Sequence, residues 1–147
     1  MLLANFAKRI DEKIDVDTHD LGFLYTLSSV AANKLTGSDE GKRAAIAAAN
    51  YLMSRVLDAA GILQAWGNLD DHRQRGRTII DSLMNMPLLY WCSEVTGDPL
   101  YAKAAIRHTA QLRDNIFRAD DSTYHTFHWD VETGAPLHGT TAQGFAD

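Results

Sequence analysis

The chain has 147 residues, 46% of them apolar, and its 14 basic and 19 acidic residues give a net charge of -5. This composition is typical of one globular domain over residues 1–147, and the acidic balance excludes a broad phosphate-binding surface for nucleic acid. No apolar stretch approaches the ~20 residues of a membrane-spanning helix, and the N-terminus lacks the apolar run of a secretory signal. Because Cys92 has no partner for an internal disulfide, we expect a cytoplasmic protein.

The first part of the chain is predicted to be helical. Residues 2–14 have apolar residues at helical spacing and form a short amphipathic helix. A second helix is predicted over residues 20–35, and Gly37 is suited to end it because glycine adopts positive φ without a Cβ penalty. An alanine-rich helix over residues 41–58 returns antiparallel to it, and residues 61–77 are expected to form a short extended segment and a long loop.

A second helical hairpin is predicted from Ile79 onward. Its first helix contains Pro87, which removes a backbone hydrogen bond when it lies inside a helix. Either the helix kinks there, or it begins near Met86 and Asp81 lies on a preceding turn. Residues 98–117 are predicted to form the returning helix.

The last part of the chain has a β pattern. Residues 123–138 alternate, are rich in aromatic and β-branched side chains, and contain a turn at 132–135, which indicates a small hairpin. The elements together predict an all-α fold with a small β-hairpin near the C-terminus.

Two carboxylates occupy matching places in the two predicted helical hairpins. Asp20 lies 17 residues before Gly37 and Asp81 lies 16 residues before Gly97, and each glycine follows a threonine. We therefore expect the two carboxylates to approach within roughly 10 Å and to face one another across a shared cavity. The residues expected on the same inward faces are Leu24, Leu27 and Ala31 in the first hairpin and Met84, Asn85, Leu88, Cys92 and Val95 in the second.

Each candidate residue also has a simpler structural interpretation. Either aspartate could be an ordinary N-cap. Two acids in one apolar cavity would instead differ in pKa, the more buried carboxyl staying protonated, as acid catalysis on a glycan requires. Trp66 is either a core residue or a stacking platform for a sugar ring, and His125 is similarly ambiguous. His125 and His128 fall on opposite faces of a strand, so no metal site is predicted.

Six motifs follow one another in order between residues 19 and 144. They are HDLGFLY at 19–25, GILQAWG at 61–67, IID at 79–81 with NMPLLYW at 85–91, TGDP at 96–99, STYHTF at 122–127 and TAQG at 141–144. Together they resemble the unsaturated glucuronyl hydrolases, glycoside hydrolase family 88. The unsaturated rhamnogalacturonyl hydrolases share that fold and are the nearest alternative. The resemblance implies part of a six-hairpin (α/α)6 barrel, in agreement with the predicted hairpins.

The resemblance also implies an enzyme that hydrates a double bond. Its substrate would be an unsaturated disaccharide or oligosaccharide, left by a polysaccharide lyase, with a C4=C5 double bond in the terminal uronic acid. Hydration gives a hemiketal that collapses and releases the sugar. Asp81 would be the general acid and base, and Asp20 would bind sugar hydroxyls and steady the cationic centre or act as nucleophile. The implied substrate-binding residues are His19, Trp66, His125 and Gln143, and no metal or organic cofactor is implied.

Family members are more than twice as long as this chain, so we expect an internal piece of the catalytic domain. About two of six hairpins do not close a barrel, and self-association is then one way to cover the inward faces. The alternative from another class is a non-catalytic helical module that binds a sugar or a partner.

Overall fold

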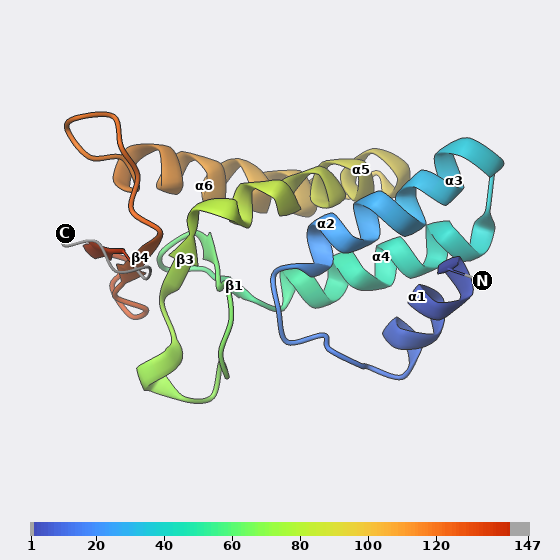
Figure 1. The fold of residues 1–147 in the computed structure, drawn as a ribbon, viewed down its shortest axis with the longest axis horizontal. Helices are drawn as coiled ribbons and strands as arrows, with labels where there is room; N and C mark the ends of the chain where they lie inside the picture. The colour runs from blue at the N-terminus through green and yellow to red at the C-terminus, as the bar shows by residue number, and fades with distance from the viewer. Residues whose placement is uncertain (1, 142–147) are drawn as a thin grey trace.

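Two helical hairpins lie side by side, and two small sheets lie at one end of the molecule below the last helix (Figure 1). The computed structural model describes residues 2–141. In the first hairpin, α2 (Leu21–Tyr25), the π-helical turn η1 (Thr26–Val30) and α3 (Ala31–Thr36) follow one another, and α4 (Asp39–Met53) returns beside them. The second consists of the 3-10 turn η3 (Ile80–Asn85), α5 (Met86–Thr96) and α6 (Pro99–Asn115). The two predicted hairpins are therefore confirmed.

The ends of the helices follow the predicted signals. Gly37 and Gly97 adopt φ values of 70° and 76° and end α3 and α5. Pro87 lies in the first turn of α5, where its missing N–H would have no helical partner. Of the two alternatives for this region, the second is correct, because the α-helix begins at Met86 and Asp81 lies on the preceding turn.

The core between the hairpins is built around small residues of α4. Ala45 and Ala48 are fully buried, as the alanine-rich pattern predicts, and belong to the same apolar cluster as Leu88 and Leu89 of α5. Small side chains let two helices approach closely. Cys92 is buried in this cluster, and burial raises the pKa of its thiol to about 12, so the side chain is a structural one.

Two residues expected on the buried faces are exposed instead. Leu27 is 75% exposed and Met84 is 63% exposed. Leu27 lies in the π-helical turn, whose buried residues are Ser29 and Val30, so the buried face of the turn lies away from Leu27. Met84 lies in a 3-10 turn with three residues per turn, so the buried stripe of α5 does not continue through it.

The helix α1 (Leu2–Asp11) packs against α4 and ends before the predicted boundary at residue 14. The Tyr25 hydroxyl donates a hydrogen bond to the Phe6 carbonyl at 3.0 Å, and Arg43 forms a bidentate ion pair with Asp11 at 2.6 and 2.9 Å. No helix within residues 2–141 is long and apolar enough to cross a membrane.

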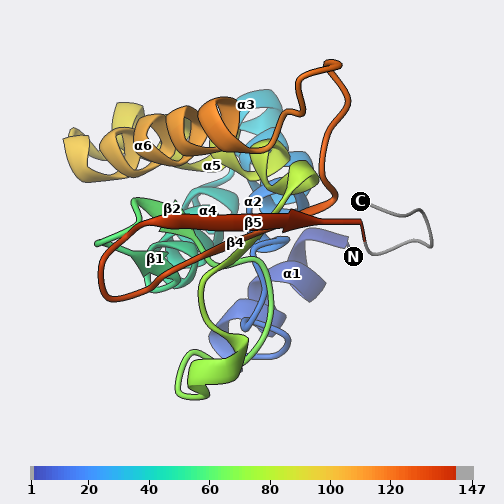
Figure 2. The same ribbon diagram turned by 90° about the vertical axis from the view of Figure 1, so that its left-hand side faces the viewer.

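Five short strands form two antiparallel sheets (Figure 2). In the first, β1 (Val56–Leu57) pairs with β2 (Ile62–Leu63); in the second, β3 (Arg77–Ile79), β4 (Thr126–Trp129) and β5 (Pro136–Thr140) lie in that order. The predicted hairpin over residues 123–138 is confirmed as β4 and β5. Strand β3 was not predicted, since three residues are too few to show alternation. It leads directly into η3, so the second sheet fixes where the second hairpin begins.

Candidate active site

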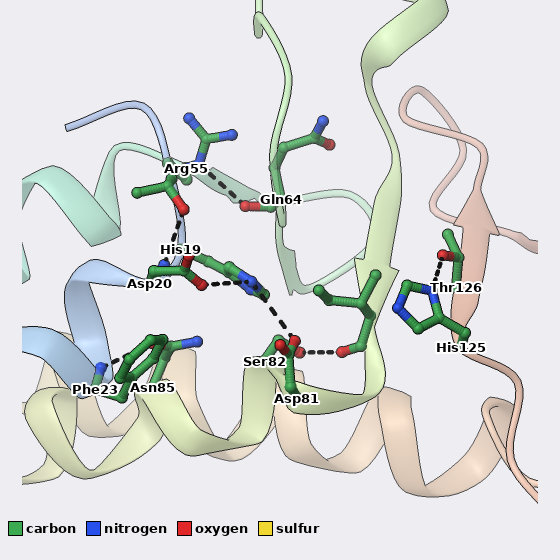
Figure 3. A network of polar contacts seen from close by, with 12 residues as sticks. His19, Asp20, Phe23, Arg55, Gln64, Asp81, Ser82, Asn85, His125 and Thr126 are labelled. Atoms are coloured by element: carbon green, nitrogen blue, oxygen red, sulfur yellow. Dashed lines mark hydrogen bonds and ion pairs between the residues drawn. The ribbon is translucent and has the colours of Figure 1, made fainter. Parts of the chain in front are cut away.

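The two carboxylates meet at one buried histidine (Figure 3). Asp20 immediately precedes α2, and Asp81 is the second residue of η3. The Nε2 atom of His19 lies 3.2 Å from Asp20 Oδ1 and 3.6 Å from Asp81 Oδ1. The two oxygens are therefore within 6.8 Å of one another, the sum of their distances to the shared nitrogen. The predicted approach of the two acids is confirmed.

Asp20 occupies the N-cap position of α2 but does not cap the helix. Its side chain makes no capping hydrogen bond. The Phe23 N–H in the first turn of α2 instead donates to Asn85 Oδ1, at 2.9 Å, and Asn85 belongs to the other hairpin. Because this cap comes from elsewhere, the Asp20 carboxylate is left to face His19. The cap also joins the two turns that carry the acids.

Replacing Asn85 by Ala is expected to lower the free energy of unfolding by about 1–2 kcal/mol, the loss typical of a removed cap. Urea unfolding measures this loss. Ser38→Ala is the matched comparison, because Ser38 caps α4 locally through Gly41 at 3.1 Å. An Asn85 variant as stable as the wild type would show that the contact with Phe23 contributes nothing.

His19 is held as a neutral hydrogen-bond donor. Its backbone N–H donates to the Ala65 carbonyl at 3.0 Å, and the ring is buried. Burial lowers the pKa of His19 and outweighs the opposing effect of Asp20 and Asp81, which raise it. Since Nε2 faces the two carboxylates, it carries the proton of the neutral ring. The other nitrogen, Nδ1, is buried and has no hydrogen-bond partner among the described residues.

The expected apolar cavity around the acids is not what the structure shows. The Asp20 and Asp81 side chains are 43% and 59% exposed, so both carboxylates are solvated. Asp20 does lie at the edge of an apolar groove of about 410 Å³, whose lining includes Phe6, Leu24 and Tyr25 but not Asp81. The two acids therefore contact the same histidine and are both exposed to solvent. They differ in that only Asp20 borders the apolar groove.

A buried arginine and glutamine shape the loop beside His19. Arg55 Nε donates to the Gln64 carbonyl at 3.0 Å, and a terminal nitrogen of Arg55 donates to the Gly67 carbonyl at 3.1 Å. The Gln64 side chain donates to the Trp66 carbonyl at 2.7 Å and accepts from the Gly76 N–H at 2.8 Å. Arg55 is not among the residues that the sequence predicted for the site. The one feature of the sequence that points to Arg55 is its position as a single basic residue at the apolar end of the alanine-rich helix.

Trp66 lies on the surface beside this loop. It is 39% exposed, and the guanidinium carbon of Arg77 lies 5.4 Å from its ring centroid. The core interpretation of Trp66 is therefore wrong. The carbonyl of its neighbour Ala65 accepts the hydrogen bond from the His19 backbone, so the exposed ring belongs to the residue next to the contact that positions His19.

The predicted binding residue His125 forms no hydrogen bond or ion pair with the acids among residues 2–141. His125 lies on the opposite side of β3 from His19 in Figure 3, and its Nδ1 is 2.9 Å from Thr126 Oγ1. Its carbonyl accepts a hydrogen bond from the Ile80 N–H at 3.0 Å, which places its backbone next to the turn of Asp81. Gln143 lies outside the described residues. Residues 2–141 contain no group of three or more His, Cys, Asp or Glu that could hold a metal ion.

Comparisons with known proteins agree on one family, although no protein-family model matches the chain. The chain is 44% identical to an unsaturated glucuronyl hydrolase of Bacillus sp. (strain GL1), over 99% of the chain and 38% of that protein. It is 43% identical to an unsaturated chondroitin disaccharide hydrolase of Streptococcus agalactiae, over 97% of the chain and 36% of that protein. By sequence, the chain is a relative of the unsaturated glucuronyl hydrolases.

Solved structures extend this relationship to the fold. The unsaturated glucuronyl hydrolase of S. agalactiae matches 99% of the chain with a TM-score of 0.93 at 43% identity, and 36% of that structure is covered. The Bacillus sp. GL1 enzyme matches 96% of the chain and 37% of its own length, with a TM-score of 0.92. The fold is thus part of the six-hairpin barrel of the unsaturated glucuronyl hydrolases, and the chain spans little more than a third of their length.

His108 is a further buried group near the acids that the sequence analysis did not assign. The Leu63 N–H donates to its Nδ1 at 3.1 Å, and its Nε2 lies 2.8 Å from Ser82 Oγ. Burial, the larger cause, and His19 lower the pKa of His108 to about 3. The ring is therefore neutral, with its proton on Nε2.

This burial predicts a dependence of stability on pH. Unfolded chains protonate His108 below its ordinary pKa of 6.5, whereas the folded chain does so only near 3. Between these values the unfolded state binds more protons, so the free energy of unfolding falls as the pH falls, by about 1.4 kcal/mol per pH unit. Urea unfolding across this window measures the slope. His108→Gln is expected to reduce it, and the same substitution at the exposed His72 is expected to leave it unchanged.

Proposed function

We propose that the chain carries the catalytic acids of an unsaturated glucuronyl hydrolase of glycoside hydrolase family 88. The observation that carries this proposal is the meeting of Asp20 and Asp81, from matching places in two hairpins, at the shared Nε2 of His19. Two solvated carboxylates joined by a neutral donor can hold and exchange a proton next to a bound substrate.

The names of the relatives support the choice of substrate. The related proteins are called unsaturated glucuronyl hydrolases and unsaturated chondroitin disaccharide hydrolases. A variant of the S. agalactiae enzyme, which matches the chain with a TM-score of 0.71 at 37% identity, was solved in complex with dGlcA-GalNAc6S. We propose the same class of substrate for this chain, an unsaturated glucuronyl residue linked to a further sugar.

Asp81 acts as the general acid and then the general base in the proposed reaction. Its proton adds to C4 of the C4=C5 double bond, which leaves a cationic centre at C5 stabilised by the ring oxygen. A water then adds its oxygen to C5 and returns a proton to Asp81. The resulting hemiketal opens, and the sugar leaves as an alcohol. The net change is the addition of one water, so the reaction uses no oxidant and no organic cofactor.

Asp20 and the aromatic residue complete the proposed site. Asp20 accepts hydrogen bonds from the sugar hydroxyls and stabilises the positive charge at C5, or attacks that carbon directly. Trp66 offers an exposed ring on which a sugar can stack. His19 links the two carboxylates, and His125 and Gln143 are proposed to contact the substrate from the C-terminal part of the chain.

The test is the loss of absorbance of an unsaturated glucuronyl disaccharide on incubation with the chain. A hydrogenated disaccharide, which lacks the double bond, is the matched control and is expected to remain unchanged. Faster turnover of an unsaturated rhamnogalacturonyl disaccharide would favour the related activity. Binding of the disaccharide without turnover would favour a non-catalytic sugar-binding module and contradict the proposal.

Self-association and a cytoplasmic location are also proposed. Exposed Leu27 and Met84 support self-association, because a second copy would remove this apolar surface from water. Sedimentation velocity at increasing concentration is expected to show assembly, and a monomer at all concentrations would contradict it. The single cysteine supports a reducing compartment.

A further inference from the structure

A closed ring of contacts connects His19 with Asp81. One side runs from His19 through the Ala65 carbonyl to the strand β2 that contains Leu63. The other side runs from Leu63 through His108 to Ser82, the residue next to Asp81. Asp81 then closes the ring by its contact with His19. The segment that holds His19 and the turn that holds Asp81 are thus connected through His108.

The hydrogen bonds of this connection all donate in the same direction, from Leu63 through His108 to Ser82. His108 Nδ1 accepts from the Leu63 N–H, so the proton of the neutral ring is on Nε2 and is donated to Ser82 Oγ. The Ser82 hydroxyl uses its own proton to donate to the Ile79 carbonyl at 2.7 Å. Ser82 and His108 are both fully buried. The Leu63 N–H, the His108 ring and the Ser82 hydroxyl therefore each donate one hydrogen bond. The last of these fixes η3 between Ile79 and Ser82, on either side of Asp81.

We propose that Ser82 and His108 are positioning residues that hold the Asp81 carboxylate next to His19. Neither residue touches the substrate, and both act through the turn η3. The inference deepens the proposed function, because it rests on the role of Asp81 as the acid. Without the Ser82 hydroxyl, η3 loses its connection to β2, and Asp81 moves away from Nε2.

The test is a double-mutant cycle read by NMR titration of the His19 ring in the whole chain. The groups acting on this ring are Asp20 and Asp81, which raise its pKa, and Arg55, which lowers it. Asp81→Asn removes one carboxylate and is expected to lower the pKa of His19. Ser82→Ala is expected to lower it by roughly 0.5 unit or more by displacing the same carboxylate.

The two changes are expected not to add. In the Asp81→Asn background, Ser82→Ala should leave the pKa of His19 where Asp81→Asn alone put it. An equal shift in both backgrounds, or no shift in folded Ser82→Ala, would overturn the proposal. The matched control is Ser29→Ala, which removes a buried hydroxyl that has no hydrogen-bond partner among the described residues and is expected to shift nothing.

Two further measurements test the positioning role without depending on a destabilised variant or on turnover. In the unmodified chain, nitrogen shifts of His108 should show a neutral ring protonated on Nε2, and protonation on Nδ1 would overturn the proposal without any variant. Ser82→Thr retains the hydroxyl and is expected to retain the wild-type pKa of His19. Absence of turnover by the unmodified chain would count against the proposed function alone, because the titration does not depend on turnover.

Discussion

Replacing Asp81 by Asn is expected to lower the rate of hydration of an unsaturated disaccharide by about 100-fold or more. A positioned general acid contributes roughly 10² to 10⁴ to a rate, and an amide cannot supply the proton that C4 receives. The side chain is 59% exposed, so the substitution should leave the fold intact. The decrease of the substrate absorbance with time measures the effect, and circular dichroism confirms that the variant is folded.

The control for this variant is Asp58→Asn. Asp58 is exposed at the end of β1, far in the sequence from both acids, and its substitution removes the same charge. It should retain the wild-type rate. An Asp81→Asn chain with the full rate would remove Asp81 from the reaction, and an equal loss in both variants would attribute the effect to net charge.

Replacing Gly22 by Ala is expected to lower the free energy of unfolding by about 3 kcal/mol, the upper part of the usual range for overpacking. An added Cβ would overlap the Cα and Cβ atoms of Asn85 and lie 2.6 Å from its carbonyl oxygen. These are mainly backbone atoms of η3, so they can move only if the two hairpins separate. Urea unfolding measures the stability, and His19 titration reports the separation of Asp20 from Asp81.

Gly37→Ala is the comparison, because it adds the same methyl group where nothing lies within 4 Å. The expected loss in the free energy of unfolding is about 1 kcal/mol, and it comes only from placing an alanine at a φ of 70°. If Gly22→Ala and Gly37→Ala had the same free energy of unfolding, the close packing of α2 on η3 at Gly22 would not contribute to stability.

The repeat in the sequence was sufficient to predict the pairing of the acids. Thr-Gly ends and helical periodicity are local signals, and they located both hairpins; the start of the α-helix near Pro87 stayed one of two alternatives. Because equivalent helix ends lie together when two hairpins pack side by side, Asp20 and Asp81 were expected to meet. Their contact with one atom of His19 fulfils that expectation.

The supporting residues could not be found in this way. Arg55, Gln64 and His108 each bind a group that is 9 to 45 residues away in the sequence, and no periodicity records such contacts. The exposure of the acids was also misjudged. Periodicity tells which face of a helix a residue occupies, but Asp20 and Asp81 lie where their hairpins begin, and both side chains there are open to solvent.

The π-helical turn Thr26–Val30 explains an asymmetry between the two halves. The first half has one more residue between its aspartate and its glycine than the second. A turn closed by i→i+5 bonds holds one residue more than an α-helical turn, so an insertion placed there is absorbed locally. Without it, an extra residue would rotate everything beyond it by about 100° around the helix axis. The first half therefore holds its extra residue without turning Asp20 away from Asp81.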